Sequence, residues 1–346
     1  MLKHDLSILI PTHNRKQKLE TLLSYIFTQI DVPVFVIDSS EEEGINFQHP
    51  NFQYIYVKGL NLVDKLDYIK YVKTKYVLLF PDDDQPALNG ILDSIIEAEK
   101  EIENVSSIIG ITLDYKEKEF QFYRFHKPFS YHFYCLNKNL SRKEKTAIIL
   151  QYYTQVMWAI HRTDYLIEFV DFIPYFVKPI SMFERNFVIF MQMKGDIYFS
   201  KKLFSFRARD PSVKKNIIDF PRAYRSLDFA DDVRRIKFEI NKIALAQGLI
   251  SEEEDIATKI FDKHLTGKTK KISNPMVKLL KKFPKSSIII KGIEFILRIK
   301  SYNIVTPFLD HGYVTIHLRK LIPLNDPSFQ EDMRKHHQFI MSKSTK

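Results

Sequence analysis

Three consecutive carboxylates, Asp82, Asp83 and Asp84, directly follow a short apolar run at residues 77–80. The run is too short for a buried helix and is typical of a core strand, which Pro81 should end because proline cannot donate to a central ladder. Carboxylates this close repel one another unless a cation neutralises them. Mg2+ and Mn2+ do so, usually through one or two carboxylates plus substrate phosphates. The triplet therefore indicates a Mn2+ or Mg2+ site, and the alternative is a solvated acidic turn.

Polar residues also follow two earlier predicted strands. The first strand ends at Pro11 and Thr12, the second ends at Asp38, and Asn14 is expected to cap the helix between them. Strand-like and helix-like segments alternate up to the triplet, which predicts an α/β fold with a parallel, doubly wound sheet. Open sheets of this kind bind ligands at the carboxyl ends of their strands. We therefore expect Thr12, Asp38 and Asp82 to line one polar pocket.

Three charged residues further along the chain are also candidates for chemistry. Glu184 begins a predicted helix at 183–193, where a carboxylate could act as a general base or could simply be favoured by the helix dipole. Arg207 and Arg209 follow a strand-like run and could either clamp phosphate or lie on the surface. The sequence leaves both pairs of alternatives open.

Composition sets the protein class. The chain has 346 residues, which is room for one large domain or two ordinary ones. Its single cysteine, Cys135, excludes an internal disulfide and is typical of a reducing compartment. No signal-peptide pattern precedes the first strand, and no stretch approaches the ~20 apolar residues of a membrane span. These features predict a cytoplasmic protein that is soluble or peripheral on the inner face of the cytoplasmic membrane.

The hydrophobic pattern becomes helical in the last third of the chain. We therefore predict two domains, an α/β domain at 1–215 and a helical module at 216–346. The net charge of +10 is concentrated in this module, because residues 263–300 hold eleven Lys and Arg against one acid, Glu294. Basic residues interleaved with apolar ones predict docking on an anionic membrane surface. The alternatives are a segment at 288–299 packed inside the module, with its lysines solvated, or a polyanion-binding surface.

Three short motifs occur in order along the first part of the chain. They are Ser7-Ile8-Leu9-Ile10-Pro11-Thr12-His13-Asn14-Arg15, Val36-Ile37-Asp38-Ser39-Ser40 and Phe80-Pro81-Asp82-Asp83-Asp84. Together they resemble the family 2 glycosyltransferases with the GT-A fold, and the resemblance covers residues 5–210. It implies a GT-A, Rossmann-like, mostly parallel sheet flanked by helices.

The resemblance implies an inverting, metal-dependent transferase. Its donor would be a nucleotide-diphosphate sugar, with a UDP-sugar favoured, and its acceptor a hydroxyl of a surface glycan or lipid-linked molecule in polysaccharide or lipopolysaccharide biosynthesis. No nucleic acid is expected as a partner. Glu184 would be the general base, and Asp84, with Asp82, would hold the metal. The expected donor-binding residues are Pro11, Thr12, Asp38, Lys65, Asp82, Asp83 and the two arginines named above, Arg207 and Arg209.

Two features depart from the family pattern. The base usually lies in a Glu-Asp pair, and here the pair is Glu184-Arg185. The Gln-x-x-Arg-Trp motif of processive synthases is absent, so the resemblance implies a transferase that adds single sugars. One alternative is a sugar-phosphate nucleotidyltransferase, although residues 11–14 lack the glycines of its phosphate loop. Another is a non-enzymatic protein that binds nucleic acid or another polyanion through 263–300, for which the triplet would not be needed.

Overall fold

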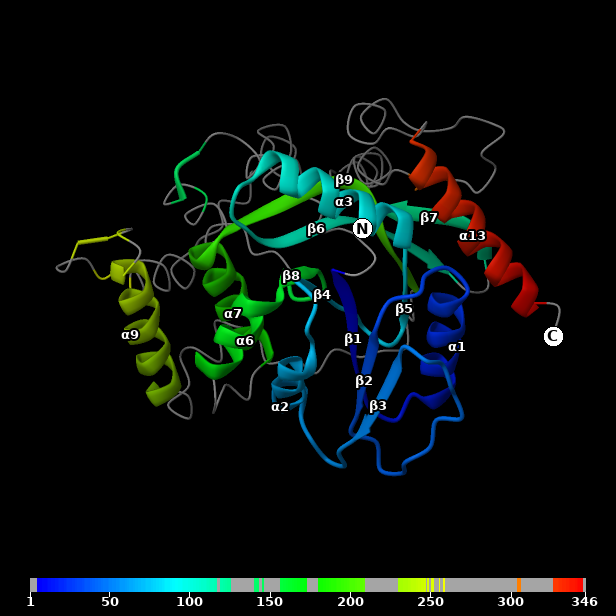
Figure 1. Cartoon of the computed structure of the whole chain (residues 1–346), viewed down its shortest axis with the longest axis horizontal. Coiled ribbons are helices and arrows are strands. Elements are labelled where there is room, and N and C mark those ends of the chain that lie inside the picture. Colours follow the sequence, from blue (N-terminus) through cyan, green and yellow to red (C-terminus); the bar gives the residue numbers. More distant parts are fainter. Residues whose placement is uncertain are drawn as a thin grey trace, which may run out of the picture.

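The computed structural model describes residues 5–116, 119–125, 156–172, 180–208, 230–246, 304–305 and 326–344, with isolated positions between them. Figure 1 shows these elements in space. In chain order they are β1 (Leu6–Thr12), α1 (Lys16–Phe27), β2 (Val34–Asp38), β3 (Phe52–Tyr56), α2 (Leu62–Lys65), the 3-10 helix η2 (Leu66–Tyr71), β4 (Tyr76–Leu79), β5 (Asp84–Pro86), α3 (Leu88–Glu101), β6 (Val105–Lys116), β7 (Glu119–Phe125), β8 (Ile160–Arg162), α6 (Thr163–Phe172), α7 (Ile180–Lys194), β9 (Asp196–Ala208), α9 (Ala230–Ala246), β10 (Ile304–Val305) and α13 (Pro327–Ser344).

The described strands form one mixed sheet in the order β10-β7-β6-β8-β4-β1-β2-β3, with β9 beside β6 and β5 beside β9. β3, β2, β1 and β4 are parallel neighbours. β8 joins β4 in the antiparallel direction and connects this parallel part to β6, which is parallel to β9. The predicted α/β sheet flanked by helices is therefore confirmed, and β4 ends just before Pro81, as predicted.

Residues of β1 alternate between the two faces of the sheet, because successive side chains of a strand point in opposite directions. Ile8 and Ile10 pack with one apolar cluster that includes α1 and α3. Leu9 packs with the other, which includes η2, α6 and α7. The polar side chains described below lie at the carboxyl ends of the parallel strands.

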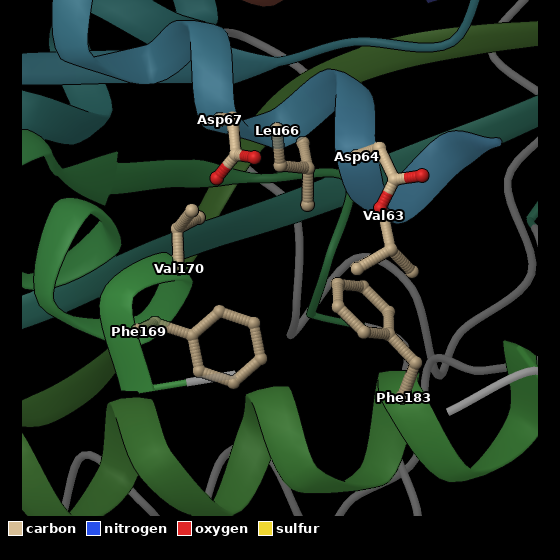
Figure 2. A pocket seen from close by; sticks show the side chains of 7 residues that line it. All are labelled: Val63, Asp64, Leu66, Asp67, Phe169, Val170 and Phe183. Atoms are coloured by element: carbon tan, nitrogen blue, oxygen red, sulfur yellow. The ribbon is translucent and has the colours of Figure 1, made fainter. Parts of the chain in front are cut away.

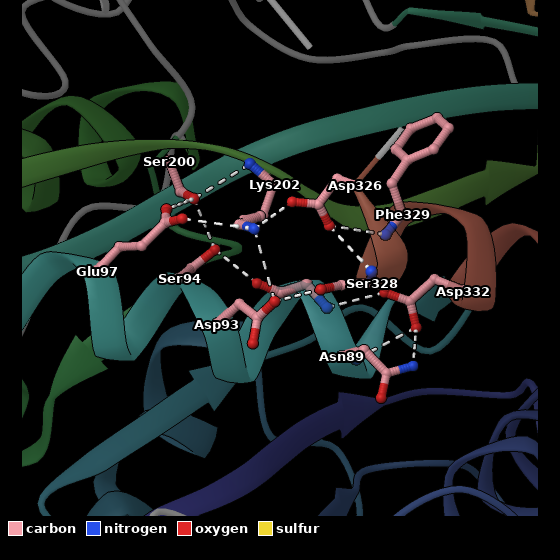
Figure 3. A network of polar contacts seen from close by, with 11 residues as sticks. Asn89, Asp93, Ser94, Glu97, Ser200, Lys202, Asp326, Ser328, Phe329 and Asp332 are labelled. Carbon is pink, nitrogen blue, oxygen red and sulfur yellow. Dashed lines mark hydrogen bonds and ion pairs between the residues drawn. The ribbon is translucent and has the colours of Figure 1, made fainter. Parts of the chain in front are cut away.

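The C-terminal helix α13 packs beside α3 and against β9 (Figure 1), although both elements lie far from α13 in the sequence. A polar network joins these three elements (Figure 3). Lys202 of β9 pairs with Asp93 and Asp326, and the carboxylate of Asp332 accepts hydrogen bonds from the N-terminal turn of α3. Helix α13 is thus fixed to the α/β layer. The predicted domain boundary at 215–216 and the basic segment 263–300 lie outside the described residues.

Two local predictions are wrong. Helix α7 begins at Ile180, so Glu184 lies in its second turn and not at its start. Asn14 does not cap α1, because the N-cap position belongs to Arg15. Asn14 instead adopts a left-handed conformation with φ 54°, which asparagine tolerates better than most residues, and its N–H donates to Ser40 Oγ. In the part of the chain that the structure describes, no helix is long and apolar enough to cross a membrane.

Candidate functional site

The ends of β1, β2 and β4 bring three polar side chains together. Thr12 and Asp38 are register partners at the ends of β1 and β2. Thr12 Oγ1 donates a 2.7 Å hydrogen bond to Asp82 Oδ2, just beyond β4. All three residues are buried, at 3–6% exposure. The sheet topology therefore brings these three polar residues together at one edge of the sheet.

Asp38 is held by hydrogen bonds from its own chain. Its Oδ1 accepts from the backbone N–H and the hydroxyl of Ser40, and its Oδ2 accepts from the Tyr54 hydroxyl at 2.8 Å. Burial, with the charge and hydrogen bond of Asp38, raises the pKa of Tyr54, so this phenol stays a donor. A carboxylate has about four acceptor positions. Asp38 is therefore oriented by three bonds and keeps an acceptor position for a ligand hydroxyl or N–H.

Lys65 places a cation next to this cluster of polar side chains. Asn61 caps the short helix α2, since its Oδ1 accepts from two backbone N–H groups, and Lys65 ends that helix. The Lys65 ammonium donates a 2.6 Å hydrogen bond to the carbonyl of Thr12. Burial lowers the pKa of Lys65, and the nearby charges of Asp38 and Asp82 oppose that shift. Lys65 thus lies beside the end of β1, and its role in donor binding stays a prediction.

Arg15 is a site residue that the sequence analysis did not single out. Its Nη1 lies 2.6 Å from Asp82 Oδ1 and 2.9 Å from Asp83 Oδ2. Partial burial alone would lower the pKa of Arg15, but the charges of the two aspartates raise it. One guanidinium therefore pairs with two carboxylates of the triplet and offsets one of their two charges. Its position could have indicated a site residue, because Arg15 is the last residue of the first motif and follows a strand end.

Asp84 opens β5 and has a different partner. In the antiparallel β5–β9 pair it lies opposite Arg207, with Arg207 Nε 3.9 Å from Asp84 Oδ2. Asp84 is buried and Arg207 is partly exposed. Arg207 therefore lies beside the triplet, and its predicted role as a phosphate clamp stays a prediction. Arg209 lies outside the described residues.

The donor set fits a metal that is shared with a ligand. Among the described residues, no group of three or more His, Cys, Asp or Glu side chains gathers as a metal site. Both oxygens of Asp82 already accept hydrogen bonds, from Thr12 and Arg15. Asp82 and Asp84 stay the predicted metal ligands, and phosphate oxygens would have to complete the shell, as is usual for Mg2+.

Glu184 lies in α7 and is half-buried. The preceding residue, Phe183, points from α7 toward Val63 of α2 (Figure 2). Phe183 and Val63 line a hollow between α2, η2, α6 and α7. Helices α7 and α2 thus both border this hollow, and the role of Glu184 as a base stays a prediction.

Comparisons with known proteins give matches among solved structures only. No family model and no curated protein matches the chain. S. aureus TarS 1-349 in complex with UDP-GlcNAc is 15% identical over 99% of this chain and 92% of that chain, with a TM-score of 0.47. Mannosyltransferase PcManGT from Pyrobaculum calidifontis in complex with GDP-Man and Mn2+ is 9% identical over 99% of this chain and 87% of that chain, with a TM-score of 0.46. At such identities the likeness concerns architecture, and the chemistry has to come from the site residues.

Proposed function

We propose that the protein is a metal-dependent glycosyltransferase that uses a nucleotide-diphosphate sugar. One observation carries the proposal: the carboxyl ends of β1, β2 and β4 place Thr12, Asp38 and Asp82 in one buried cluster, with Lys65 behind it. Asp84 and Arg207 stand beyond Asp82 on the β5–β9 pair. A carboxylate that accepts from hydroxyls, next to a carboxylate–arginine pair, suits a ligand with a ribose at one end and a diphosphate at the other.

The donor would bind along this edge, and a UDP-sugar is favoured. Asp38, held by Ser40 and Tyr54, would accept a hydrogen bond from the ribose or the base. Pro11 and Thr12 form the adjoining wall at the end of β1. The Arg207 guanidinium would lie against the diphosphate, where planar donors bind phosphate oxygens in pairs.

The chemistry would be a direct displacement at the anomeric carbon. Mn2+ or Mg2+, held by Asp84 and the phosphate oxygens, would stabilise the charge of the leaving nucleoside diphosphate. Arg207 adds a fixed positive charge beside Asp84. Glu184 would take the proton from the acceptor hydroxyl as that oxygen bonds to the sugar, and the leaving group would depart from the opposite face, which inverts the anomeric centre.

The test is a calorimetric titration with UDP, with and without Mn2+. We expect Mn2+ to strengthen UDP binding to the wild type, and Asp84→Ala to abolish that strengthening because the direct metal ligand is gone. Asp171→Ala, which removes an exposed carboxylate paired with Lys70, should behave as the wild type. Undiminished Mn2+-dependent affinity in a folded Asp84→Ala protein would contradict the assignment. A parallel titration with DNA distinguishes a polyanion-binding protein.

We propose further that the acceptor is a glycan or lipid-linked molecule reached at an anionic membrane surface through 263–300. The support is the charge excess of this segment. A lysine near an anionic leaflet adds ~1 kcal/mol of attraction. Changing Lys278, Lys281, Lys282 and Lys285 together to Glu should release the protein from anionic vesicles in co-sedimentation and spare donor hydrolysis. A wild type that stays in the supernatant at low salt would show that the segment does not dock.

A further inference from the structure

The imidazole of His336, on α13, lies against the strand that carries Asp84. His336 Nε2 is 2.6 Å from Gln85 Oε1, an oxygen that also accepts a 3.0 Å hydrogen bond from the Tyr115 hydroxyl. The imidazole is stacked on Phe206 of β9, with 3.8 Å between ring centroids and 10° between planes. His336 has 0% exposure, and burial lowers its pKa to about 3. The ring is therefore neutral near pH 7, and with Gln85 Oε1 as the acceptor its Nε2 carries the proton.

Two of the residues that His336 contacts, Gln85 and Phe206, are themselves a cross-strand pair. Gln85 lies opposite Phe206 in the β5–β9 register, and the next pair along the ladder is Asp84 opposite Arg207. Neighbouring residues of a strand point to opposite faces. His336 therefore holds the pair on one face of this ladder, and Asp84 and Arg207 stand on the other face.

The ladder needs such support. β5 has three residues, and among the described strands it pairs with β9 alone. So short an edge strand gains little stability from its own ladder bonds. His336 adds a hydrogen bond to β5 and a stacked ring to β9, so one side chain joins both strands.

We infer that His336 is a positioning residue of the donor site: it clamps the β5–β9 ladder from behind and thereby fixes the spacing of Asp84 and Arg207. Helix α13 then belongs to the donor site, although it follows β5 by more than two hundred residues in the sequence. The choice of UDP as the ligand rests on the proposed function. The effect of His336 on the β5–β9 ladder can be measured without any ligand.

Three variants separate the clamp from general stability. His336→Phe keeps a flat ring on Phe206 and removes the hydrogen bond to Gln85. His336→Gln keeps an N–H donor at a similar reach. Arg334→Ala is the matched control, because it removes an exposed ion pair with Glu331 on the same helix, away from the ladder.

Two measurements on the full-length chain decide the outcome. Hydrogen–deuterium exchange of peptides covering 84–86 and 204–208 should accelerate in His336→Phe, which loses the hydrogen bond, and in His336→Gln, which loses the stacked ring, and not in Arg334→Ala. The affinity for UDP with Mn2+ should fall about fivefold in His336→Phe, the usual effect of one lost hydrogen bond, and Arg334→Ala should bind like the wild type.

The inference is overturned if His336→Phe exchanges in these peptides no faster than Arg334→Ala. It is also overturned if exchange accelerates while UDP affinity stays unchanged. If the wild type itself does not bind UDP, the proposed function fails, and exchange in β5 and β9 alone decides whether His336 holds the ladder.

Discussion

Arg15 places one nitrogen, Nη1, within hydrogen-bond distance of both Asp82 and Asp83. The sequence predicts that a divalent ion neutralises the triplet. In the structure the guanidinium of Arg15 pairs with two of the three carboxylates and offsets one of their charges. Because the side chain of Arg15 is 41% exposed, solvent screens the pair, and its contribution is at most ~1 kcal/mol. The guanidinium can therefore be displaced at modest cost, and it competes with any cation that approaches Asp82.

Arg15→Ala should strengthen the binding of Mn2+ in the absence of nucleotide by about threefold to fivefold, the factor that corresponds to ~1 kcal/mol. The reason is that Asp82 and Asp83 lose the guanidinium that pairs with them and competes with Mn2+. Mn2+ titration followed by electron paramagnetic resonance measures the change. Arg162→Ala is the control, since Arg162 pairs with Asp164 outside the site. Weaker Mn2+ binding in Arg15→Ala would show that the arginine does not compete with the metal.

Glu184→Gln should lower kcat by ~10²–10⁴-fold and leave donor affinity nearly intact, because it keeps the shape of the side chain and removes the base. Glu168→Gln is the matched control. Glu168 is a glutamate of the neighbouring helix α6 and pairs with Lys194. Turnover within a few-fold of the wild type in Glu184→Gln, measured by donor consumption with acceptor present, would mean that another residue is the base.

At the scale of elements, α3 approaches β9 so closely that only a glycine fits between them. A Cβ at Gly90 would lie 2.0 Å from the carbonyl oxygen of Leu203, a backbone atom that cannot move aside alone. The N–H of Gly90 also donates to Asp332 of α13. One position therefore sets the contacts of α3 with both β9 and α13.

Gly90→Ala should lower the free energy of unfolding by ~2 kcal/mol or more, because overpacking forces two backbones apart. This outcome opposes helix propensity, which alone would favour alanine by ~1 kcal/mol. Urea unfolding followed by circular dichroism measures the change, with Lys100→Ala on the exposed side of the same helix as control. Unchanged stability in Gly90→Ala would mean that α3 and β9 are less closely packed than described.

The elements of the first eighty residues were predictable because their signals are local. Asp38 and Pro81 mark strand ends, whereas β1 continues through Pro11 to Thr12, and parallel strands bring such ends together whatever the details of packing. The pairing of β5 with β9 and the position of His336 were not predictable, because they depend on long-range register and no local pattern encodes it. Glu184 was misplaced within its helix because helix ends are the least certain part of a pattern, and Arg15 was missed because a charged residue after a strand resembles any surface charge.

At the scale of the whole molecule, three buried groups make stability depend on pH. Burial lowers the pKa of His161 to about 4 and that of His336 to about 3, and burial raises the pKa of Asp332 to about 6. In the unfolded chain, histidine titrates near pH ~6.5 and aspartate near ~3.9. Between pH 5 and 6 the unfolded chain therefore binds two protons at the histidines, and the folded chain binds about one at Asp332. The net uptake on unfolding is about one proton, so stability falls as the pH falls.

We expect the free energy of unfolding to decrease by up to ~1.4 kcal/mol per pH unit from pH 6 to pH 5. Asp332→Asn should steepen this dependence toward two protons, because it removes the group that gains a proton in the folded state. His161→Gln should flatten it. Urea unfolding at a series of pH values measures all three slopes. Equal slopes in the wild type and Asp332→Asn would show that Asp332 is not protonated in the folded protein at pH 5.

The long sequence separation between α13 and the strands it covers has a consequence for biosynthesis. During translation, β5 and its Gln85 emerge long before the helix that satisfies Gln85, and β9 lies between them in the chain. Domains fold as they are synthesised, N-terminal parts first, and contacts that close long loops form late. The nascent chain should thus form its parallel strands β1 to β4 well before α13 can pack against β5 and β9. A ribosome that pauses before residue 336 would expose a partly formed sheet with an unprotected edge, so this interval is where we expect the newborn chain to depend on chaperones.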